Sequence, residues 1–382
     1  MHGITRLGVA AATALAAVGA FAPSAAATAH GDNGPHRGGH HAVFVQTDNP
    51  AGNQIVAYHR ADDGTLTQDG LYDTGGLGGV LDGSVADHLA SQGALTYDEQ
   101  HGLLYAVNAG SDTVTVFSVD GDHLDKRQVI DSGGRFPVSV AVHDDIVYVL
   151  NALDGGSVQG YTVHDGHLHK QADWNRCLGL DPNPTPQFTH TPGQVGFVSD
   201  GSQLVVTTKA NGNNLDIFQL DHAGAPSDTP VVTNLPGAVP FGFVPNGRHG
   251  IFLTEAGPNT LATFTIHPDG TATQDASAAT GKSATCWVVA VRDLLYTSNA
   301  GSSTLTGFRT ADHGRSLTAL GNTPTNPGTV DAAVSTNGHF LYVQTGVNGI
   351  LDAFTVNDDG SLTPLGSQTV PDGTGGEGIV AF

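Results

Sequence analysis

The sequence is poor in basic residues and in glutamate. Its 382 residues include 14 Lys and Arg against 36 Asp and Glu, which gives a formal net charge of −22. That charge repels phosphate backbones and anionic headgroups, so nucleic acid is not an expected partner. Only Glu99, Glu255 and Glu377 are glutamates, which leaves 33 aspartates. Because aspartate favours turns over helix interiors, we expect an all-β chain with many turns.

Long apolar runs are also scarce. One such run, from Leu7 to Ala22, follows Arg6 and precedes small residues in Ala-x-Ala spacing. This pattern predicts a secretory signal peptide over residues 1–29, cleaved after Ala27 or Ala29, and hence a secreted protein. No comparable run occurs later, so no membrane insertion is expected.

Cysteine is nearly absent from the chain, which holds only Cys177 and Cys286. In an oxidising compartment these two can pair, so one alternative is a disulfide between them and the other is two separate buried thiols. Residues 30–41 carry four histidines and almost no apolar side chains, which predicts a flexible arm. Such an arm binds metal only adventitiously, because it has no rigid geometry, and no designed metal site is expected.

From residue 42 onward one pattern recurs: strand, Leu-Tyr-type strand, strand with an aromatic residue, turn, strand. This is a four-stranded antiparallel unit. The turn is often Asp-Gly, as at Asp63 and Asp359, which predicts a tight hairpin with both central residues at positive φ. The aromatic residues that mark the third strand of each unit are separated by 44 to 59 residues and are Tyr58, Phe117, Tyr161, Phe218, Phe264, Phe308 and Phe354.

Seven units, each too small to bury both of its faces, predict a radial stack. We therefore expect residues 42–382 to form one seven-bladed β-propeller domain of four-stranded antiparallel blades. The chain enters this region at the second strand of a unit and finishes with a lone first strand, 375–382. The C-terminal strand should complete the first blade. A closed ring has no free sheet edge, so a monomer is expected.

The second-strand segments resemble the Tyr-Val-Thr-Asn repeat of bacterial β-propellers. They read Leu-Tyr-Ala-Val-Asn at 104–108, Val-Tyr-Val-Leu-Asn at 147–151 and Leu-Tyr-Thr-Ser-Asn at 295–299. With the Asp-Gly turns, the chain is similar to the lactonase (6-phosphogluconolactonase-like) propeller family over residues 42–382. The resemblance implies a small anionic lactone as candidate substrate, although a fold does not carry a function by itself.

Chemistry in a propeller is expected at the mouth of the central channel. Lys209 and Glu255 occupy equivalent positions of neighbouring units, and both residue types are rare in this chain. Glu255 is the candidate base that activates water and Lys209 its electrostatic partner, whereas a plain salt bridge between blades gives the same pattern. The equivalent positions of the other units carry neutral polar residues, which either contact a ligand or cap turns: Thr47, Asn108, Asn151, Asn299 and Thr345.

The starts of the inner strands supply a second group of candidate substrate-binding residues, Gln194, Asp331 and Glu377, beside Gln92. Glu377 stands between glycines, where backbone and ligand approach closely, or where the closing strand simply needs a tight entry. Cys286 next to Trp287 is better explained by a disulfide or a core position than by a nucleophile.

The chain departs from the enzymatic members of this family at one point. Glu255 matches their glutamate, but the segment that should carry an Arg-His pair reads Ala238-Val-Pro-Phe241. The leading hypothesis is an exported hydrolase of a small lactone at the channel mouth. The alternative is a non-catalytic propeller that binds a ligand or a partner at the cell envelope or outside the cell. No cofactor is expected, since only Trp174 and Trp287 are available to stack on one.

Overall fold

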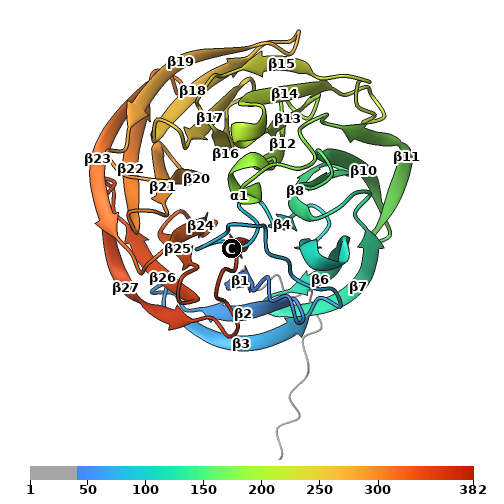
Figure 1. Ribbon diagram of the computed structural model, residues 1–382. Helices are drawn as coiled ribbons and strands as arrows, with labels where there is room; N and C mark the ends of the chain where they lie inside the picture. Colours follow the sequence, from blue (N-terminus) through green and yellow to red (C-terminus); the bar gives the residue numbers. More distant parts are fainter. Residues whose placement is uncertain (1–40) are drawn as a thin grey trace, which may run out of the picture. The chain divides into compact units, whose positions relative to one another are not determined.

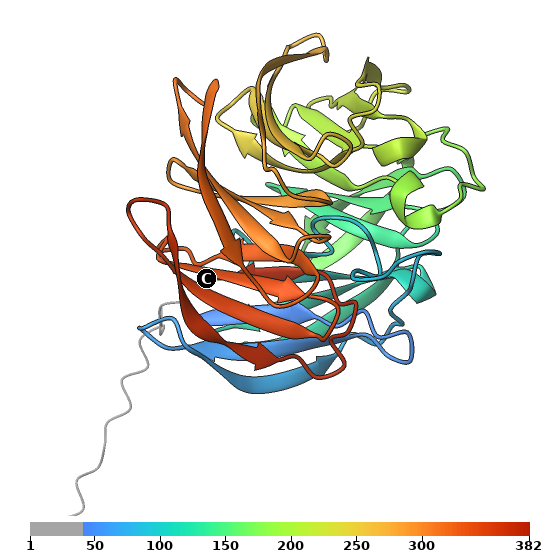
Figure 2. The same ribbon diagram turned by 60° about the vertical axis from the view of Figure 1, so that its left-hand side comes forward.

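The computed structural model describes residues 41–382. The predicted signal peptide (1–29) and the arm up to residue 40 lie outside the described residues. Within the described part, 28 strands form seven four-stranded antiparallel sheets. The sheets stand side by side as the blades of a ring (Figure 1), and the turned view shows their twist (Figure 2). The predicted seven-bladed propeller is confirmed.

We number the blades 1 to 7 and give each from its inner strand outward. Blade 1 is β28 (Ile379–Ala381), β1 (Ala42–Gln46), β2 (Gln54–Arg60) and β3 (Leu66–Asp73); blade 2 is β4 (Leu95–Asp98), β5 (Leu103–Asn108), β6 (Thr113–Asp120) and β7 (His123–Asp131); blade 3 is β8 (Pro137–His143), β9 (Ile146–Asn151), β10 (Ser157–His164) and β11 (His167–Cys177); blade 4 is β12 (Gln194–Val198), β13 (Gln203–Thr207), β14 (Asn214–Gln219) and β15 (Val231–Asn234).

Blade 5 is β16 (Pro240–Asn246), β17 (Gly250–Glu255), β18 (Thr260–Ile266) and β19 (Ala272–Ala279); blade 6 is β20 (Thr285–Val291), β21 (Leu294–Asn299), β22 (Thr304–Ala311) and β23 (Ser316–Pro324); blade 7 is β24 (Thr329–Val334), β25 (Phe340–Thr345), β26 (Ile350–Val356) and β27 (Leu362–Thr369). Three short helical turns complete the described residues: η1 (Ala109–Ser111), α1 (Gln187–His190) and η2 (Lys209–Asn211).

The ring closes as the sequence predicts. Strand β28 pairs antiparallel with β1, Val45 opposite Ile379 and Val43 opposite Ala381. Ala42 and Phe382 exchange both of their backbone hydrogen bonds, at 3.1 and 3.0 Å. The two ends of the described chain therefore lie in one sheet, which removes a free edge from blade 1.

The marker aromatic of every blade lies in its third strand and is at most 3% exposed. In six blades the pairing with the fourth strand shifts register at or directly before this residue, for example between Val116 and Phe117 and between Phe354 and Ala353. A β-bulge increases the local twist of a strand. The repeated bulge therefore increases the twist of the outer strands in these six blades.

In three blades the tyrosine of the second strand is hydrogen-bonded to the outer turn of the next blade. The second-strand tyrosine of blade 3, Tyr148, donates a hydrogen bond to the carbonyl of Gly224 in the outer turn of blade 4, at 2.7 Å. Tyr296 and Tyr342 likewise donate to Gly360 and Gly64 in the outer turns of blades 7 and 1, at 3.0 and 2.8 Å. A buried tyrosine needs a partner for its hydroxyl, and the next blade's turn supplies it.

Most Asp-Gly turns differ from the predicted two-residue hairpin. At Asp63 only Gly64 has positive φ, the loop closes through Ala61 and Thr65, and the carboxylate accepts hydrogen bonds from the amide and hydroxyl of Thr65. The turns at Asp269 and Asp359 repeat this arrangement with Thr271 and Ser361. In these three turns the aspartate therefore accepts hydrogen bonds that close the turn. The predicted positive φ at both residues is found at Asp165-Gly166.

Candidate functional site

Two long loops cover the end of the ring at which the inner strands begin. They are residues 74–94, between β3 and β4, and residues 178–193, which contain α1. In the view down the ring, α1 is drawn near the middle (Figure 1). The loops bond to each other, because Asp82 N donates to the Gln187 side chain at 2.9 Å and Phe188 N donates to the Asp82 carbonyl at 3.3 Å.

The end of the first loop, residues 86–93, crosses the channel, and we call it the plug. The amide side chain of Gln92 pairs with both backbone groups of Val288 in blade 6, at 2.9 and 3.0 Å. The backbone N of Gln92 donates to Gly193 beside blade 4, and the Ser139 hydroxyl of blade 3 donates to the Gln92 carbonyl. Residues from three blades thus hold one plug residue, so the chain itself fills the centre of the channel.

Lys209 is fully buried at the start of η2 and joins the two loops. Its ammonium group donates to the carbonyls of Ala90 and Phe188, at 2.5 and 2.7 Å, and to the Thr191 hydroxyl at 3.1 Å. These three bonds use all three hydrogens of the ammonium group. Burial lowers the pKa of Lys209 to about 8, against the opposing charges of Asp87 and Glu377.

Glu377, also fully buried, joins the closing strand to the plug. Its carboxyl oxygens lie 3.1 Å from Ser91 N and 2.6 Å from Ser91 Oγ, and that hydroxyl lies 2.8 Å from the Val138 carbonyl. One hydroxyl hydrogen cannot serve both oxygens, so a proton on Glu377 satisfies the arrangement. Burial, with the neighbouring charge of Asp87, raises the pKa of Glu377 well above its ordinary value.

Three further carboxyl groups surround Glu377. Asp48 accepts a hydrogen bond from Glu377 N at 2.7 Å, and the Asp87 carboxyl is hydrogen-bonded to that of Glu377. Burial raises the pKa of Asp48 to about 8 and that of Asp331 to about 7. Asp87 has a different role, since its Oδ1 accepts bonds from Leu89 N and Ala90 N, at 3.0 and 2.6 Å, and so shapes the plug.

A cavity of about 560 Å³ lies beside the plug, between the two loops and blades 4 to 7. Asp87 and Lys209 line it together with Cys286 and Trp287 of β20. Trp287 donates its ring N–H to the Ser91 carbonyl, which fixes the indole against the plug. Asn259 also lines the cavity, and because its Oδ1 accepts a bond from Thr285 N, its amide nitrogen is the group left for a ligand.

The structure does not bring Glu255 and Lys209 together. Glu255 is 6% exposed, accepts a hydrogen bond from the Thr260 hydroxyl at 2.7 Å, and lines a separate cavity of about 350 Å³ beside residues 234–238. Burial raises its pKa. Among residues 41–382 no salt bridge joins Glu255 to Lys209; their polar groups have other partners, and the two residues line different cavities. The predicted pairing of the two charges is therefore absent.

The three predicted substrate-binding asparagines are fully buried and lie outside the 560 Å³ cavity. Asn108 donates to Thr113 and Thr115 at 3.1 and 2.9 Å. Asn151 donates to the Ser132 carbonyl, and Asn299 to Thr304 and Thr306. Asn151 and Asn299 thus bond to backbone carbonyls, as the turn-capping alternative expects, whereas the bonds that Asn108 donates go to threonine hydroxyls.

The remaining candidates lie at the starts of inner strands. The Gln194 side chain bonds to both backbone groups of Phe243 and so links blades 4 and 5. Asp331 and Glu377 belong to the group of buried carboxyls near Asp87 and do not line the 560 Å³ cavity. The disulfide alternative is wrong, because Cys177 is exposed at the end of β11 and Cys286 is buried in β20, and both thiols are free. Burial raises the pKa of Cys286, which keeps the thiol neutral.

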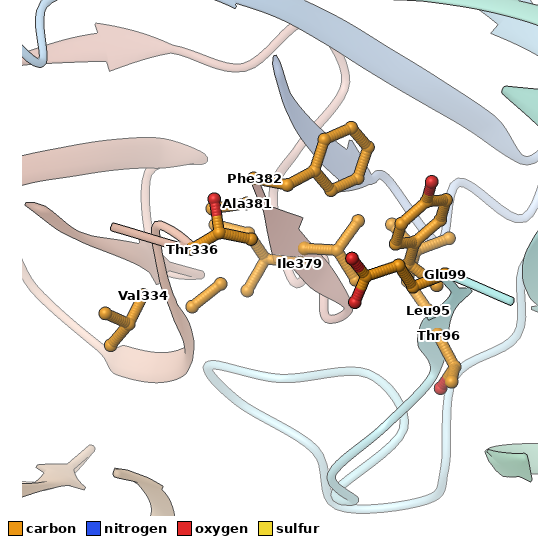
Figure 3. Close-up of a pocket in the computed structure, with 11 residues that line it drawn as sticks. Leu95, Thr96, Glu99, Val334, Thr336, Ile379, Ala381 and Phe382 are labelled. Carbon is orange, nitrogen blue, oxygen red and sulfur yellow. The ribbon is translucent and has the colours of Figure 1, made fainter. Parts of the chain in front are cut away.

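A third cavity, of about 430 Å³, opens at the other end of the inner strands. Ile379, Ala381 and Phe382 of the closing segment stand between Val334 and Thr336 on one side and Leu95, Thr96 and Glu99 on the other (Figure 3). It lacks the group of buried charges found beside the plug.

Among the described residues, no three His, Cys, Asp or Glu side chains are grouped so that they could hold a metal ion. Residues 41–382 also contain no helix long and apolar enough to cross a membrane.

These observations define the protein as a seven-bladed β-propeller with a candidate site at one end of its channel. The model of the protein family described as "Lactonase, 7-bladed beta-propeller" matches residues 83–375 of this chain. The chain belongs to that family. No curated protein matches the chain.

Solved structures with the same fold include two bacterial proteins whose descriptions name a lactonase. A protein of Bacteroides fragilis proposed to be a 6-phosphogluconolactonase superposes with a TM-score of 0.70 at 16% identity, over 88% of this chain and 96% of that one. The periplasmic gluconolactonase of Pseudomonas aeruginosa superposes with a TM-score of 0.69 at 16% identity, over 88% and 98%. At this identity the likeness shows the fold.

Sequence reasoning missed Asp87 and Asn259. A signal for the region was present, since the marker aromatics are 44 to 46 residues apart except in two intervals, 59 between Tyr58 and Phe117 and 57 between Tyr161 and Phe218. These two intervals contain the two long loops that cover the channel. Extra loop length at two points of a regular repeat therefore marked the site.

Proposed function

We propose that this protein hydrolyses a lactone in the 560 Å³ cavity beside the plug. The observation that carries the proposal is the lining of that cavity, where a member of the lactonase family places a carboxylate, Asp87, and an amide with an uncommitted nitrogen, Asn259. In this role Asp87 takes a proton from water, and the water oxygen adds to the lactone carbonyl. The ring C–O bond then breaks, and Asp87 returns the proton to the ring oxygen, which gives the hydroxy acid and restores the carboxylate.

The buried neighbours suit Asp87 to this role. Burial raises the pKa of Glu377 well above its ordinary value, so a neutral carboxyl and not a second negative charge lies next to Asp87. The bonds from Leu89 N and Ala90 N orient the carboxylate. The Asn259 amide supplies a donor for the oxygen that becomes negative as water adds. Lys209 contributes a positive charge to the cavity wall while its hydrogens hold the two loops.

The test measures hydrolysis of a panel of phosphorylated and unphosphorylated lactones by the wild-type protein and by Asp87→Asn. Asparagine keeps the oxygen that accepts the two plug amides but cannot take a proton. We expect turnover to fall about 10²- to 10⁴-fold while ligand binding is retained. Full turnover by Asp87→Asn would remove Asp87 as the base.

The sequence-based hypothesis for Glu255 is tested by the same panel. If Glu255→Gln abolishes turnover and Asp87→Asn does not, catalysis belongs to the cavity beside residues 234–238. Because the two carboxylates line different cavities, the two variants give separate answers.

A second candidate function, non-catalytic ligand binding in the same cavity, is favoured by one observation. Lys209 has no hydrogen left for a substrate, and the segment from Ala238 to Phe241 supplies no cation. Binding without turnover across the whole lactone panel would establish this function instead.

We also propose that the protein acts outside the cell as a monomer. The N-terminal 29 residues supply the export sequence, and closure of blade 1 by β28 leaves no unpaired edge there for a second copy. Expression with the native N-terminus should release a protein that begins after Ala27 or Ala29, which mass spectrometry detects. Light scattering should give one chain per particle.

A further inference from the structure

The lining of the cavity beside the plug is far more apolar than a site for a phosphorylated sugar requires. Six alanines, three valines, two phenylalanines and Trp287 make up 12 of its 18 lining residues. Phe188 of α1 and Phe241 of β16 supply aromatic faces, and Phe241 packs edge-on against Trp287 at 4.9 Å between ring centres. Surfaces of this kind bind apolar groups by removing them from water.

The charges in the wall argue against an anionic ligand. Lys209 is the one cationic side chain among the lining residues, and its three hydrogens are already bonded to Ala90, Phe188 and Thr191. Its ammonium group also lies 5.2 Å from the centre of the Phe241 ring. A phosphate dianion in this cavity would meet no free ammonium or guanidinium donor and would lie near the Asp87 carboxylate, so it would lose its hydration without compensation.

The rim of the cavity exposes apolar side chains to water. Val85, in the loop that leads into the plug, is 87% exposed, and Val347, in the turn after β25, is 42% exposed. Both line the cavity. A ligand with an apolar tail would cover these two side chains as well as the floor, which increases the apolar area buried on binding.

We infer that the cavity takes an uncharged lactone whose ring carries an alkyl or aryl substituent, and that it rejects phosphorylated or otherwise anionic lactones. The lactone ring in this statement rests on the proposed function. The preference for an uncharged, apolar ligand rests on the lining itself.

Binding can be followed separately from hydrolysis, because the chain has only two tryptophans and one of them lines the cavity. Trp174 lies in β11, stacks on Tyr148 and does not line the cavity. The variant Trp174→Phe therefore keeps Trp287 as the single indole. The probes are δ-lactams with alkyl chains of increasing length, which resemble lactones and resist hydrolysis. Each CH₂ that enters the cavity should strengthen binding by about fourfold until the space is filled, seen as a shift of Trp287 emission.

A filling variant locates the binding. Ala300 lines the cavity, and Ala300→Leu should weaken lactam binding at least about tenfold by occupying the space. Ala51→Leu, in an exposed turn between β1 and β2, is the matched control and should bind as the parent does. If Ala300→Leu binds the lactams unchanged, the ligand lies elsewhere and the inference is overturned.

Hydrolysis is then compared for an alkyl δ-lactone and 6-phosphogluconolactone with the same protein. A higher kcat/KM for the alkyl lactone supports both the function and the inference. Faster hydrolysis of the phosphorylated lactone, with no lactam binding, overturns the inference and leaves the lactonase function in place. Lactam binding that grows with chain length, without hydrolysis of either lactone, sustains the apolar preference and overturns the function. If the protein neither binds the lactams nor hydrolyses either lactone, the inference and the proposed function are both overturned.

Discussion

The two ends of the channel are formed by the same seven inner strands and differ in what covers them. Beside the plug, loops of 21 and 16 residues cover a cavity of about 560 Å³, which is lined by one carboxylate, Asp87, one ammonium group, Lys209, and one side-chain amide, Asn259. At the other end short hairpins join the strands, and a cavity of about 430 Å³ is formed by the closing strand and its neighbours. The repeat itself supplies space at both ends, and an inserted loop adds the carboxylate of Asp87 at one of them.

The largest effect should come from removing the buried carboxyl that holds the plug. Glu377→Ala leaves Ser91 N without its acceptor and opens a void, which should lower the free energy of unfolding by about 3 kcal/mol. Glu377→Gln should stay within about 1 kcal/mol of wild type, because its amide donates where the protonated carboxyl does. Chemical denaturation measures both, and equal losses for the two variants would contradict a protonated Glu377.

Stability should fall as pH rises from about 5 to 8. The pKa values of Asp48 and Asp331 are raised to about 8 and about 7, so between those values and the ordinary value near 4 the folded chain holds more protons than the unfolded chain. While one such group is protonated only in the folded state, each unit of pH increase lowers the free energy of unfolding by about 1.4 kcal/mol. Lys209, with its pKa lowered to about 8, acts in the opposite sense above pH 8.

Thermal unfolding across this range measures the slope. Asp331→Asn should flatten it, since the amide cannot ionise, whereas Asp293→Asn, at an exposed turn, should leave it as in wild type. A midpoint that rises steadily from pH 5 to 8 would contradict the burial of these carboxyls.

A smaller and more local effect is expected for Lys209→Met. The variant leaves the carbonyls of Ala90 and Phe188 without a donor, so the two loops should exchange backbone amides faster over residues 81–92 and 187–191, and ligand binding should weaken about tenfold. Lys126→Met is the control, because Lys126 donates to one exposed carbonyl at 3.3 Å. Hydrogen exchange with mass spectrometry resolves the two loops, and unchanged exchange there would show that Lys209 does not hold them.

The smallest effects belong to positions away from the plug. Thr336→Leu, at the rim of the cavity at the other end, should change neither turnover nor lactam binding and should alter stability by less than about 0.5 kcal/mol. Glu255→Gln should keep turnover within about twofold of wild type. A large loss of activity in either variant would reverse the comparison between the ends of the ring.

The fold was predictable because its signals are local and repeated. The marker aromatics and the outer-turn glycines recur in all seven units, Leu-Tyr or Val-Tyr strands occur in four of them, and the lone C-terminal strand implied closure. The hydrogen bond from Tyr148 to Gly224 was not predictable, although both motifs were visible, because it depends on the angle between adjacent blades. The bulge beside Phe117 was hidden for the same reason.

The site was less predictable than the fold because its carboxylate lies in a loop that interrupts the repeat. Equivalent positions in neighbouring blades suggested that Lys209 and Glu255 act together, but one side chain turns toward the plug and the other toward the loop that precedes β16. Asp87 lies in an inserted loop, which has no counterpart in the other blades. Only the irregular spacing of the aromatics pointed to it.

The bond between Ser91 and Glu377 joins residues 286 positions apart, and Asp48 reaches Glu377 across 329 positions. A growing chain exposes its N-terminal residues to solvent long before it contains its last strand. The wall of the cavity can therefore take its final form only after synthesis is complete. A polypeptide that stops short of residue 377 would lack both ring closure and a finished cavity, so premature termination cannot release a chain with a working site.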